Sequence, residues 1–549
     1  MFNSKMFTKK FRLKIASSII IIFLLIMPNV FADVEYKQIN LQKNLDLENK
    51  QQINNESEWK QITDNGFGKD TNLATRGMAV YNGELYIGTQ NVKLPKLFED
   101  RFPELFEDLS QLLPNKLPKF LSRSLLLKTI YRLKNLLRDN FFRKFLHLLV
   151  RRSEGCEIWK YNFTTDSLTQ IVGDNSITGM KAGFNYKFNC LATVIIEFKG
   201  KLYVGTWNTP IGSLKDPFRK GAEIWRYDGK QWEPVVGDDA PFVKGGFGNF
   251  NNAGIASMEV FNGYLYAGTM NWGYSFFGGC EIWRTQDGLQ WERVVAHGFK
   301  QNMSISDLLK GVSNTYIWNM EVFQNQLYVG TFNSCYKFFS NKGMGCQLWR
   351  TSSGENWTKV DLPSGFEGVY QDGFGDPENN YGIRTMAVYN DELYVGTAAN
   401  LVLDNGFEIW KYNGINWTPV ISAKAPGARP GDKTYSGFGN PLNKYAWSMA
   451  VTSDNKLYVG TANGKFVNLM EPQTDGCEIW CYNGTDWLPI VKDGIGEESN
   501  GFGNIKNEGA RSIIEYPQGT GNIVVGTFKL VSTRPLLPQE GCSLWMRIE

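Results

Sequence analysis

Histidine is almost absent from this sequence, which has only His147 and His297 among its 549 residues. So few imidazoles exclude a histidine-rich metal site and leave a Ser-His-Asp arrangement without a ready base. No P-loop or dinucleotide fingerprint follows a strand and opens a helix. We therefore expect no metal, no cofactor and no nucleic-acid partner.

Long hydrophobic runs are also scarce, and the one of note lies at the N-terminus. Five Lys and Arg in residues 1–14 precede the apolar stretch IASSIIIIFLLIM, and Val30-Phe31-Ala32 offers a small-residue cleavage site. Residues 1–32 are predicted to be a signal peptide, with an uncleaved membrane anchor as the alternative. Residues 33–56 then form a linker, and the protein is expected to be secreted or at the cell surface.

Cysteine is sparse for a disulfide scaffold, with eight residues in the chain. Five cysteines occupy one repeated position, Gly-Cys-(Glu/Gln/Ser)-(Ile/Leu)-Trp, and equivalent positions in different repeats lie too far apart for a disulfide. We expect them to be buried thiols that pack as small hydrophobes. Cys335 and Cys346 form the only pairing that the spacing suggests. The five are Cys156, Cys280, Cys346, Cys477 and Cys542.

A five-residue motif, Leu-Tyr-Val-Gly-Thr, recurs along the chain. Its seven copies, the last degenerate, carry their glycines at positions 88, 205, 268, 330, 396, 460 and 526, so the steps are 117, 63, 62, 66, 64 and 66. Around each copy, short β-rich runs are separated by Asn-Gly or Asp-Gly turns, which is typical of a four-stranded antiparallel meander. Seven such meanders predict an all-β, seven-bladed β-propeller over residues 57–549.

The two ends of the chain predict how the ring closes. The seventh repeat stops at GCSLWMRIE and has no fourth strand. The segment SEWKQITDNGFG near the N-terminus has the pattern of a fourth strand, although the first three strands of a repeat do not precede it. Trp59 and Gly66-Phe67-Gly68 match the fourth strands and following loops of the other repeats. We expect the N-terminal strand to complete the last blade, which leaves no open sheet edge.

Two short motifs resemble those of known propeller families. The turns TQDGLQW from Thr285 and TSSGENW from Thr351 are similar to the Asp-box of sialidases and other exported propellers. The Leu-Tyr-Val-Gly-Thr strands resemble those of kelch-type and galactose-oxidase-like propellers. This resemblance implies the fold and no particular activity.

The first repeat carries a long insertion, residues 93–152, with 14 Lys and Arg against 6 Asp and Glu. Its second half spaces Leu126, Ile130, Leu133 and Leu137 by three or four residues, which predicts an amphipathic helix. We expect this basic helical insertion to cap the mouth of the propeller by docking on its acidic body. Contact with a membrane surface and docking of a protein partner stay open.

Function is expected where the repeats differ, on the face that gathers the variable loops. Counting back from each motif to the start of the first strand of each blade gives one position per repeat at the channel mouth. In five consecutive blades it carries Trp or Arg, and Arg suits carboxylates and phosphates while Trp stacks on sugars. The predicted ligand is an anionic carbohydrate, and the alternative is ordinary packing with the arginines paired to acids. The candidate residues are Arg76, Arg384, Arg511, Trp318 and Trp447.

No pair of carboxylates is singled out for catalysis, although Asp238, Asp376 and Glu378 fall near this face. We therefore favour a monomeric binding module for an anionic glycan over an enzyme, with the catalytic residues unassigned. A polysaccharide hydrolase or lyase, and a protein-docking scaffold that uses residues 93–152, are the alternatives.

Overall fold

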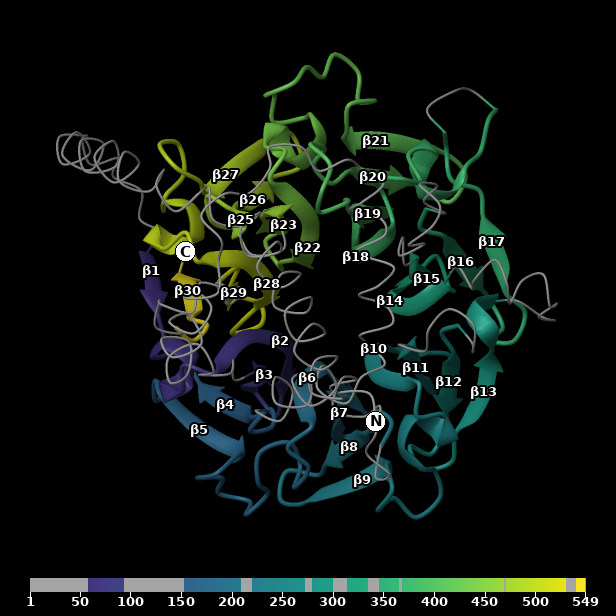
Figure 1. Ribbon diagram of the computed structural model, residues 1–549, viewed down its shortest axis with the longest axis vertical. Helices are drawn as coiled ribbons and strands as arrows, with labels where there is room; N and C mark the ends of the chain where they lie inside the picture. The colour runs from purple at the N-terminus through teal and green to yellow at the C-terminus, as the bar shows by residue number, and fades with distance from the viewer. Residues whose placement is uncertain are drawn as a thin grey trace, which may run out of the picture. The chain divides into compact units, whose positions relative to one another are not determined.

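The computed structural model describes residues 58–92, 153–208, 220–271, 279–299, 314–333, 345–364, 368–468, 471–529 and 540–548. Over these residues the chain is all-β, with strands joined by turns and short 3-10 helices (Figure 1). The predicted signal peptide (1–32), linker (33–56) and helical insertion (93–152) lie outside them, as does Cys335. No helix in the described part is long and apolar enough to cross a membrane.

The strands form seven four-stranded antiparallel groups, which we number meander 1 to meander 7 along the chain. A separate small hairpin pairs β24 with β25. Meander 1 consists of β2 (Asn72–Tyr81), β3 (Glu84–Asn91), β4 (Ile158–Asn162) and β5 (Ser167–Val172), and meander 2 of β6 (Asn189–Phe198), β7 (Lys201–Asn208), β8 (Ile224–Tyr227) and β9 (Trp232–Val236). Meander 3 consists of β10 (Asn252–Phe261), β11 (Tyr264–Asn271), β12 (Ile282–Thr285) and β13 (Glu292–Val295), and meander 4 of β14 (Asn314–Phe323), β15 (Gln326–Asn333), β16 (Leu348–Thr351) and β17 (Thr358–Val360). Meander 5 consists of β18 (Gly382–Tyr389), β19 (Glu392–Ala398), β20 (Ile409–Tyr412) and β21 (Trp417–Ile421), and meander 6 of β22 (Asn443–Val451), β23 (Leu457–Asn463), β26 (Ile479–Tyr482) and β27 (Trp487–Val491). Meander 7 consists of β28 (Asn507–Glu515), β29 (Ile523–Lys529), β30 (Leu544–Ile548) and β1 (Glu58–Gln61). The separate hairpin consists of β24 (Lys465–Asn468) and β25 (Glu471–Gln473).

Single bridges between neighbouring meanders close the described strands into a propeller-like ring. The second strand of each meander pairs at one residue with the first strand of the next, and Phe528 of β29 pairs with Ala74 of β2 to complete the circle. The first strands therefore lie innermost, around the centre of the ring in Figure 1. This arrangement fits the predicted count of seven.

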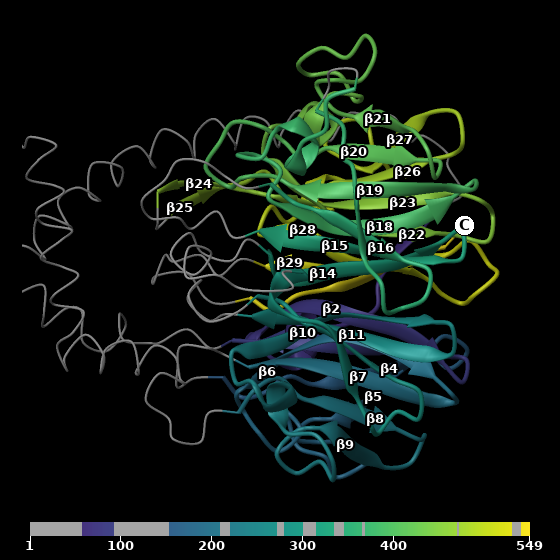
Figure 2. The ribbon, with the colours of Figure 1, turned by 90° about the vertical axis from the view of Figure 1, so that its right-hand side faces the viewer.

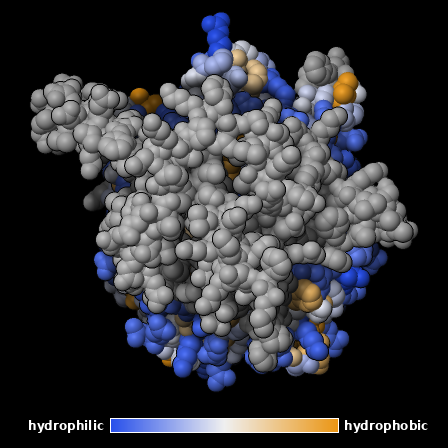
Figure 3. Space-filling view, viewed as in Figure 1, coloured by the Kyte–Doolittle hydropathy of each residue, from blue (hydrophilic) through white to orange (hydrophobic). Residues whose placement is uncertain are grey.

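Apolar side chains between facing meanders form the core. Alternate residues of a strand point to opposite sheet faces, so each meander packs on both neighbours. Ile224 and Tyr203 of meander 2, for example, share a buried cluster with Ile255 and Leu265 of meander 3. Seen edge-on, the meanders stack side by side around the ring (Figure 2). The described residues visible around the rim in the space-filling view are mainly hydrophilic (Figure 3).

The predicted seam between the chain ends is confirmed. β1 pairs antiparallel with β30, with Glu58 opposite Ile548 and Trp59 opposite Arg547. Glu497 holds both strands, because it accepts a hydrogen bond from Trp59 Nε1 at 3.1 Å and two from Arg547 at 2.8 Å. The N-terminal strand is thus the outer strand of meander 7.

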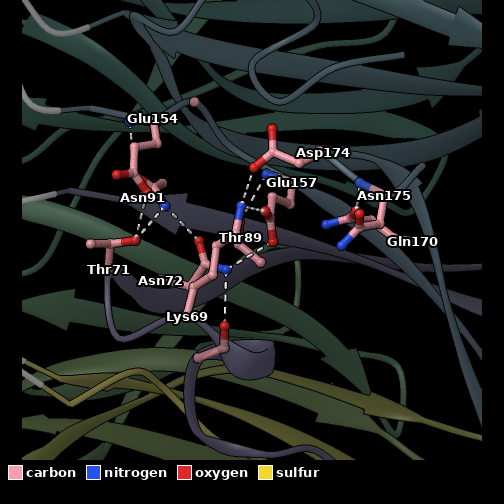
Figure 4. A network of polar contacts seen from close by, with 12 residues as sticks. Lys69, Thr71, Asn72, Thr89, Asn91, Glu154, Glu157, Gln170, Asp174 and Asn175 are labelled. Carbon is pink, nitrogen blue, oxygen red and sulfur yellow. Dashed lines mark hydrogen bonds and ion pairs between the residues drawn. The ribbon is translucent and has the colours of Figure 1, made fainter. Parts of the chain in front are cut away.

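A repeated polar unit pins the Gly-Phe-Gly loops to the strands that follow them. In meander 1, Asn72 donates to buried Glu157, which also accepts from Lys69 at 2.6 Å (Figure 4). Asn72 donates to the carbonyl of Gly66 as well, and Glu157 accepts from Trp159 Nε1 at 3.0 Å. Equivalent Asn–Glu–Trp contacts recur in meanders 2, 3 and 5, and Gln replaces Glu in meander 4. These glutamates are architectural. The loops carry 3-10 helices η2 (Asn65–Gly68), η4 (Gly245–Gly248), η5 (His297–Phe299), η6 (Asp372–Gly375), η7 (Ser436–Gly439) and η8 (Asn500–Gly503).

The five cysteines at the repeated position are buried free thiols, as predicted. Burial raises the pKa of the Cys280 thiol well above its ordinary value, so it stays protonated and packs as an apolar group. Cys346 is a free thiol among the described residues, and its suggested partner Cys335 lies outside them.

Candidate functional site

A β-bulge in the first strand of each meander creates one equivalent position around the ring. In meander 5, Ile383 pairs with Thr397 and Thr385 with Gly396, so Arg384 is the extra residue without a partner in the ladder. A bulge re-aims its side chain and is frequent beside functional sites. The five candidate residues all fall at this position, in meanders 1, 4, 5, 6 and 7, while meanders 2 and 3 carry Thr193 and Ala256. The structure therefore brings the predicted residues onto one arc.

Arg384 occupies the middle of this arc between two indoles. Its guanidinium carbon lies 5.2 Å from the ring centre of Trp318 and 6.0 Å from that of Trp447. The side chain is only 6% exposed, and its Nε has no hydrogen-bond partner among the described residues. Burial lowers its pKa well below the ordinary value, and the neighbouring Arg76 and Arg511 lower it further.

Arg511 repeats this arrangement two meanders further on. Its guanidinium lies 5.0 Å from the ring centre of Trp447 and 5.3 Å from that of Phe528, and its Nη1 donates to Gln90 at 3.1 Å. Its buried Nε also has no partner among the described residues. Burial and the nearby Arg76 lower its pKa well below the usual range.

Arg76 reaches from meander 1 toward meander 3. Its Nη2 donates to the carbonyl of Ala256 at 3.2 Å, and burial lowers its pKa to about 10. The three guanidinium groups thus lie close enough to repel one another, and no described carboxylate forms an ion pair with any of them. Because a guanidinium stays protonated in proteins, gathering these three charges lowers the free energy of unfolding of the protein.

The tryptophans of the arc separate the arginines. Two glycines give them room, since a Cβ on Gly382 would lie 2.2 Å from Trp318 Cζ3, and one on Gly509 would lie 2.1 Å from Trp447 Cζ3. Each indole therefore lies over the backbone of the next meander and beside its arginine. The sequence suggested that these indoles stack on sugars, which stays a prediction; in the structure the guanidinium groups of Arg384 and Arg511 lie over them.

A partly buried aromatic cluster borders the same arc. Tyr316 stacks on Phe332 at 4.7 Å, and Trp318 meets Phe332 edge-on at 4.5 Å. The hydroxyls of Tyr381 and Tyr445 lie 2.6 Å apart, and the Tyr445 ring is 5.9 Å from both Trp318 and Trp447. Sequence reasoning missed these residues and Phe528, although they lie two or three positions from the bulge or on the adjoining strand.

The acidic residues near this face do not form a catalytic pair with one another in the described contacts. Asp376 accepts a hydrogen bond from the backbone of Asn379, and Asp238 faces Lys220 at 3.9 Å. A different pair, Glu259 and Glu321, lies on neighbouring inner strands, where burial raises the pKa of Glu259 to about 7 and that of Glu321 to about 8. Within the described ranges, no three His, Cys, Asp or Glu side chains are grouped to hold a metal ion.

Comparison with known proteins identifies no specific family for this chain. No protein-family model and no curated protein matches the sequence. Among solved structures, a PL25 ulvan lyase bound to a GlcA(1-4)Rha3S fragment is 11% identical, with a TM-score of 0.42 over 88% of this chain and 94% of the lyase. The β-propeller domain of the Trilobed protease from Pyrococcus furiosus is 9% identical, with a TM-score of 0.37 over 86% of this chain and 95% of that domain.

A sialidase from Trypanosoma rangeli, in complex with the inhibitor DANA, is 10% identical, with a TM-score of 0.32 over 64% of this chain and 53% of the sialidase. The neighbours thus include propeller-type proteins that act on glycans. At these scores the likenesses carry no argument about activity.

Proposed function

We propose that the protein is an exported, seven-bladed β-propeller that binds an anionic carbohydrate at the mouth of its channel. One observation carries the proposal: Arg76, Arg384 and Arg511 converge on one arc without an acidic partner among the described residues. Arg384 is buried and Arg76 and Arg511 are half-buried, and cations gathered in such a place destabilise a fold unless an anion compensates them. A ligand that supplies this anion would gain affinity from the same charges.

The carbohydrate part of the proposal rests on the aromatic cluster beside the arginines. Partly buried rings of Tyr316 and Phe332 adjoin Trp318. Rings that combine an apolar face with limited solvent contact are suited to packing against the C–H face of a sugar. An anionic glycan would therefore contact the arginines with its charged groups and the rings with its pyranose faces.

Direct binding to a panel of glycans tests the proposal. Acidic oligosaccharides are expected to bind the purified protein in titration calorimetry, while neutral oligosaccharides of equal length are not. Arg384→Ala is expected to weaken binding by roughly 30-fold or more, because a charged hydrogen bond contributes about 2 kcal/mol or more.

Arg293→Ala is the matched control, since Arg293 also lies over an indole, at 5.8 Å from Trp283, but is paired with Glu281. This variant should bind as the parent does. Equal affinity for neutral and acidic glycans, or an undiminished affinity of Arg384→Ala, would refute the proposal.

The Tyr445 hydroxyl supports a second candidate, a lyase that cleaves a uronate-containing glycan. Tyr445 interacts electrostatically with Arg384, and tyrosine can act as a general base. Arg384 would neutralise the uronate carboxylate, and Tyr445 would take the proton from C5. The electron pair would form the C4–C5 double bond as the C4–O bond breaks, and the departing oxygen would take a proton from Tyr381 or water.

Cleavage products distinguish the lyase from the binding module. A lyase would create unsaturated sugar ends, which absorb in the ultraviolet, and Tyr445→Phe would abolish their formation while leaving binding in place. Binding without any new absorbance across neutral and alkaline pH would exclude this candidate.

A further inference from the structure

The bulge positions divide the mouth of the ring into two unequal sides. Meanders 4 to 7 carry a tryptophan or an arginine there, whereas meanders 2 and 3 carry Thr193 and Ala256. Two small residues on inner strands should leave an open space in front of them. Both residues are nevertheless buried, so another part of the protein covers this side.

Arg76 reaches this side from meander 1. Its Nη2 donates to the carbonyl of Ala256 in meander 3 at 3.2 Å. Meander 2 lies between these two meanders, because β3 bridges to β6 and β7 bridges to β10, and β2, β6 and β10 follow one another around the centre of the ring (Figure 1). The side chain of Arg76 therefore spans the inner strand of meander 2 and runs across one side of the mouth.

The backbone of Ala256 holds the end of this side chain. Ala256 is the extra residue of a β-bulge, so its carbonyl is left out of the ladder between β10 and β11. A carbonyl at a buried residue needs a donor, and Arg76 supplies it. In meander 2, Thr193 is turned aside, because its hydroxyl donates to the carbonyl of Ile255. The path of Arg76 across meander 2 is thus left free.

The other side of the mouth carries a continuous series of aromatic rings. Five half-buried rings follow one another along meanders 4 to 7, with neighbouring ring centres 4.5 to 5.9 Å apart. Arg76 interacts electrostatically with Tyr316 of meander 4, where this aromatic side begins. The five rings are those of Phe332, Trp318, Tyr445, Trp447 and Phe528.

We propose that Arg76 closes the side of the mouth in front of meanders 2 and 3 and confines the ligand to the aromatic side, so that the site selects unbranched acidic glycans over branched ones. An unbranched chain can lie along the rings of meanders 4 to 7, whereas a branch directed toward the centre of the ring would meet Arg76. This inference rests on the proposed function, because it specifies the shape of the ligand that the same site accepts.

Thermal unfolding of paired variants tests the position of Arg76 without any ligand. Ala256→Leu adds bulk beside Arg76 and is expected to lower the Tm of the full chain by about 2 to 4 °C. In an Arg76→Ala background the vacated space should accept the leucine, so the loss in Tm should fall to less than half. In an Arg293→Ala background, the matched control, the full loss should remain. Equal losses in all three backgrounds would overturn the inference.

Titration calorimetry with paired glycans tests the selectivity. The two ligands are a linear acidic oligosaccharide and the same chain with one side branch. The parent protein is expected to bind the linear chain roughly tenfold more tightly, because the branch clashes with a side chain held in place. Arg76→Ala should bind both ligands with equal affinity. Arg76→Lys keeps a long side chain with a donor and should retain the preference.

The two measurements separate this inference from the proposed function. Equal affinity of the parent for the linear and the branched glycan would overturn the inference and leave the proposed function standing. An Arg76→Ala variant that keeps the preference would overturn it as well. A reduced loss in Tm in the Arg76→Ala background, without binding of any acidic glycan, would support the closure of this side by Arg76 and refute the proposed function.

Discussion

Two sets of buried charges lie in the same ring and differ in how they are satisfied. In the Asn–Glu–Trp units, Glu157 and its equivalents accept hydrogen bonds from an Asn, an indole and, in meander 1, Lys69. At the bulge position, Arg384 stacks on indoles but has neither an acid nor a hydrogen-bond acceptor among the described residues. The glutamates are thus compensated by side chains of the protein itself, whereas Arg384 has no such partner among the described residues.

This difference separates architecture from function within one repeat. A charge that recurs in several meanders and is fully satisfied holds a loop to a strand. We propose that a charge that appears in some meanders only, and lacks a partner among the described residues, serves to bind a ligand. Substitutions in the two sets should therefore have opposite effects on stability and binding.

Removing a glutamate from the satisfied set should have the largest effect. Glu157→Ala leaves Asn72 and Trp159 without their acceptor and Lys69 with Asp174 as its remaining ion-pair partner. Loss of one member of a buried charged network costs about 3 to 5 kcal/mol. The measurement is urea unfolding, and the surviving folded fraction should still bind the anion. A change below about 1 kcal/mol would contradict the architectural role.

Filling the space beneath an indole should damage the arc without removing a charge. Gly509→Ala places a methyl group 2.1 Å from Trp447 Cζ3, so the indole that lies beside Arg384 and Arg511 must shift. Such overpacking costs about 1 to 3 kcal/mol. Anion binding, measured by calorimetry, should be lost although all three arginines remain. Unchanged binding would show that the indoles do not position the guanidinium groups.

Replacing an unsatisfied arginine by an apolar residue should stabilise the empty ring. Arg384→Met removes a buried charge that its neighbours repel, and we expect the unliganded Tm to rise by the equivalent of about 1 kcal/mol while binding is lost. Arg547→Met is the contrast, because it breaks the bonds to Glu497 at the seam and should lower the Tm. A fall in Tm for Arg384→Met would mean that the arginine contributes to the fold.

Glu259 and Glu321 should make the stability of the fold depend on pH. Both pKa values are raised in the fold, so the folded state holds more protons than the unfolded state, and stability falls as pH rises from about 4 through about 8. Glu259→Gln with Glu321→Gln should flatten this loss between pH 5 and pH 8. Thermal unfolding at both pH values measures it, and parallel shifts of parent and variant would contradict it.

The sequence sufficed for the repeat, the seam and the location of the arc. Trp59 and the Gly-Phe-Gly loop identified β1 as an outer strand, because local pattern determines which strand of a meander a segment forms. Counting back from each motif reached the bulge in all seven meanders, even where the spacing varied. These features depend on position along the chain, which a sequence displays directly.

The contacts of the arc could not be predicted in the same way. Whether Trp447 faces a ligand or an arginine depends on the side chains that two other meanders bring beside it, more than 60 residues away. The pairing of indoles with Gly382 and Gly509 has a sequence signal, a glycine two residues before each arginine, that is recognisable only once the ring is closed. The Tyr381–Tyr445 contact likewise joins two meanders.

The seam between β1 and β30 also decides how the ring would respond to force. Glu58 pairs with Ile548, so the chain enters β1 and leaves β30 at the same end of this strand pair. Pulling the two ends apart would therefore break the hydrogen bonds between β1 and β30 one after another, whereas a shearing geometry would load them all at once. All meanders of the ring contribute to its stability against thermal unfolding, whereas a low force applied to the two chain ends would open it at the β1–β30 seam.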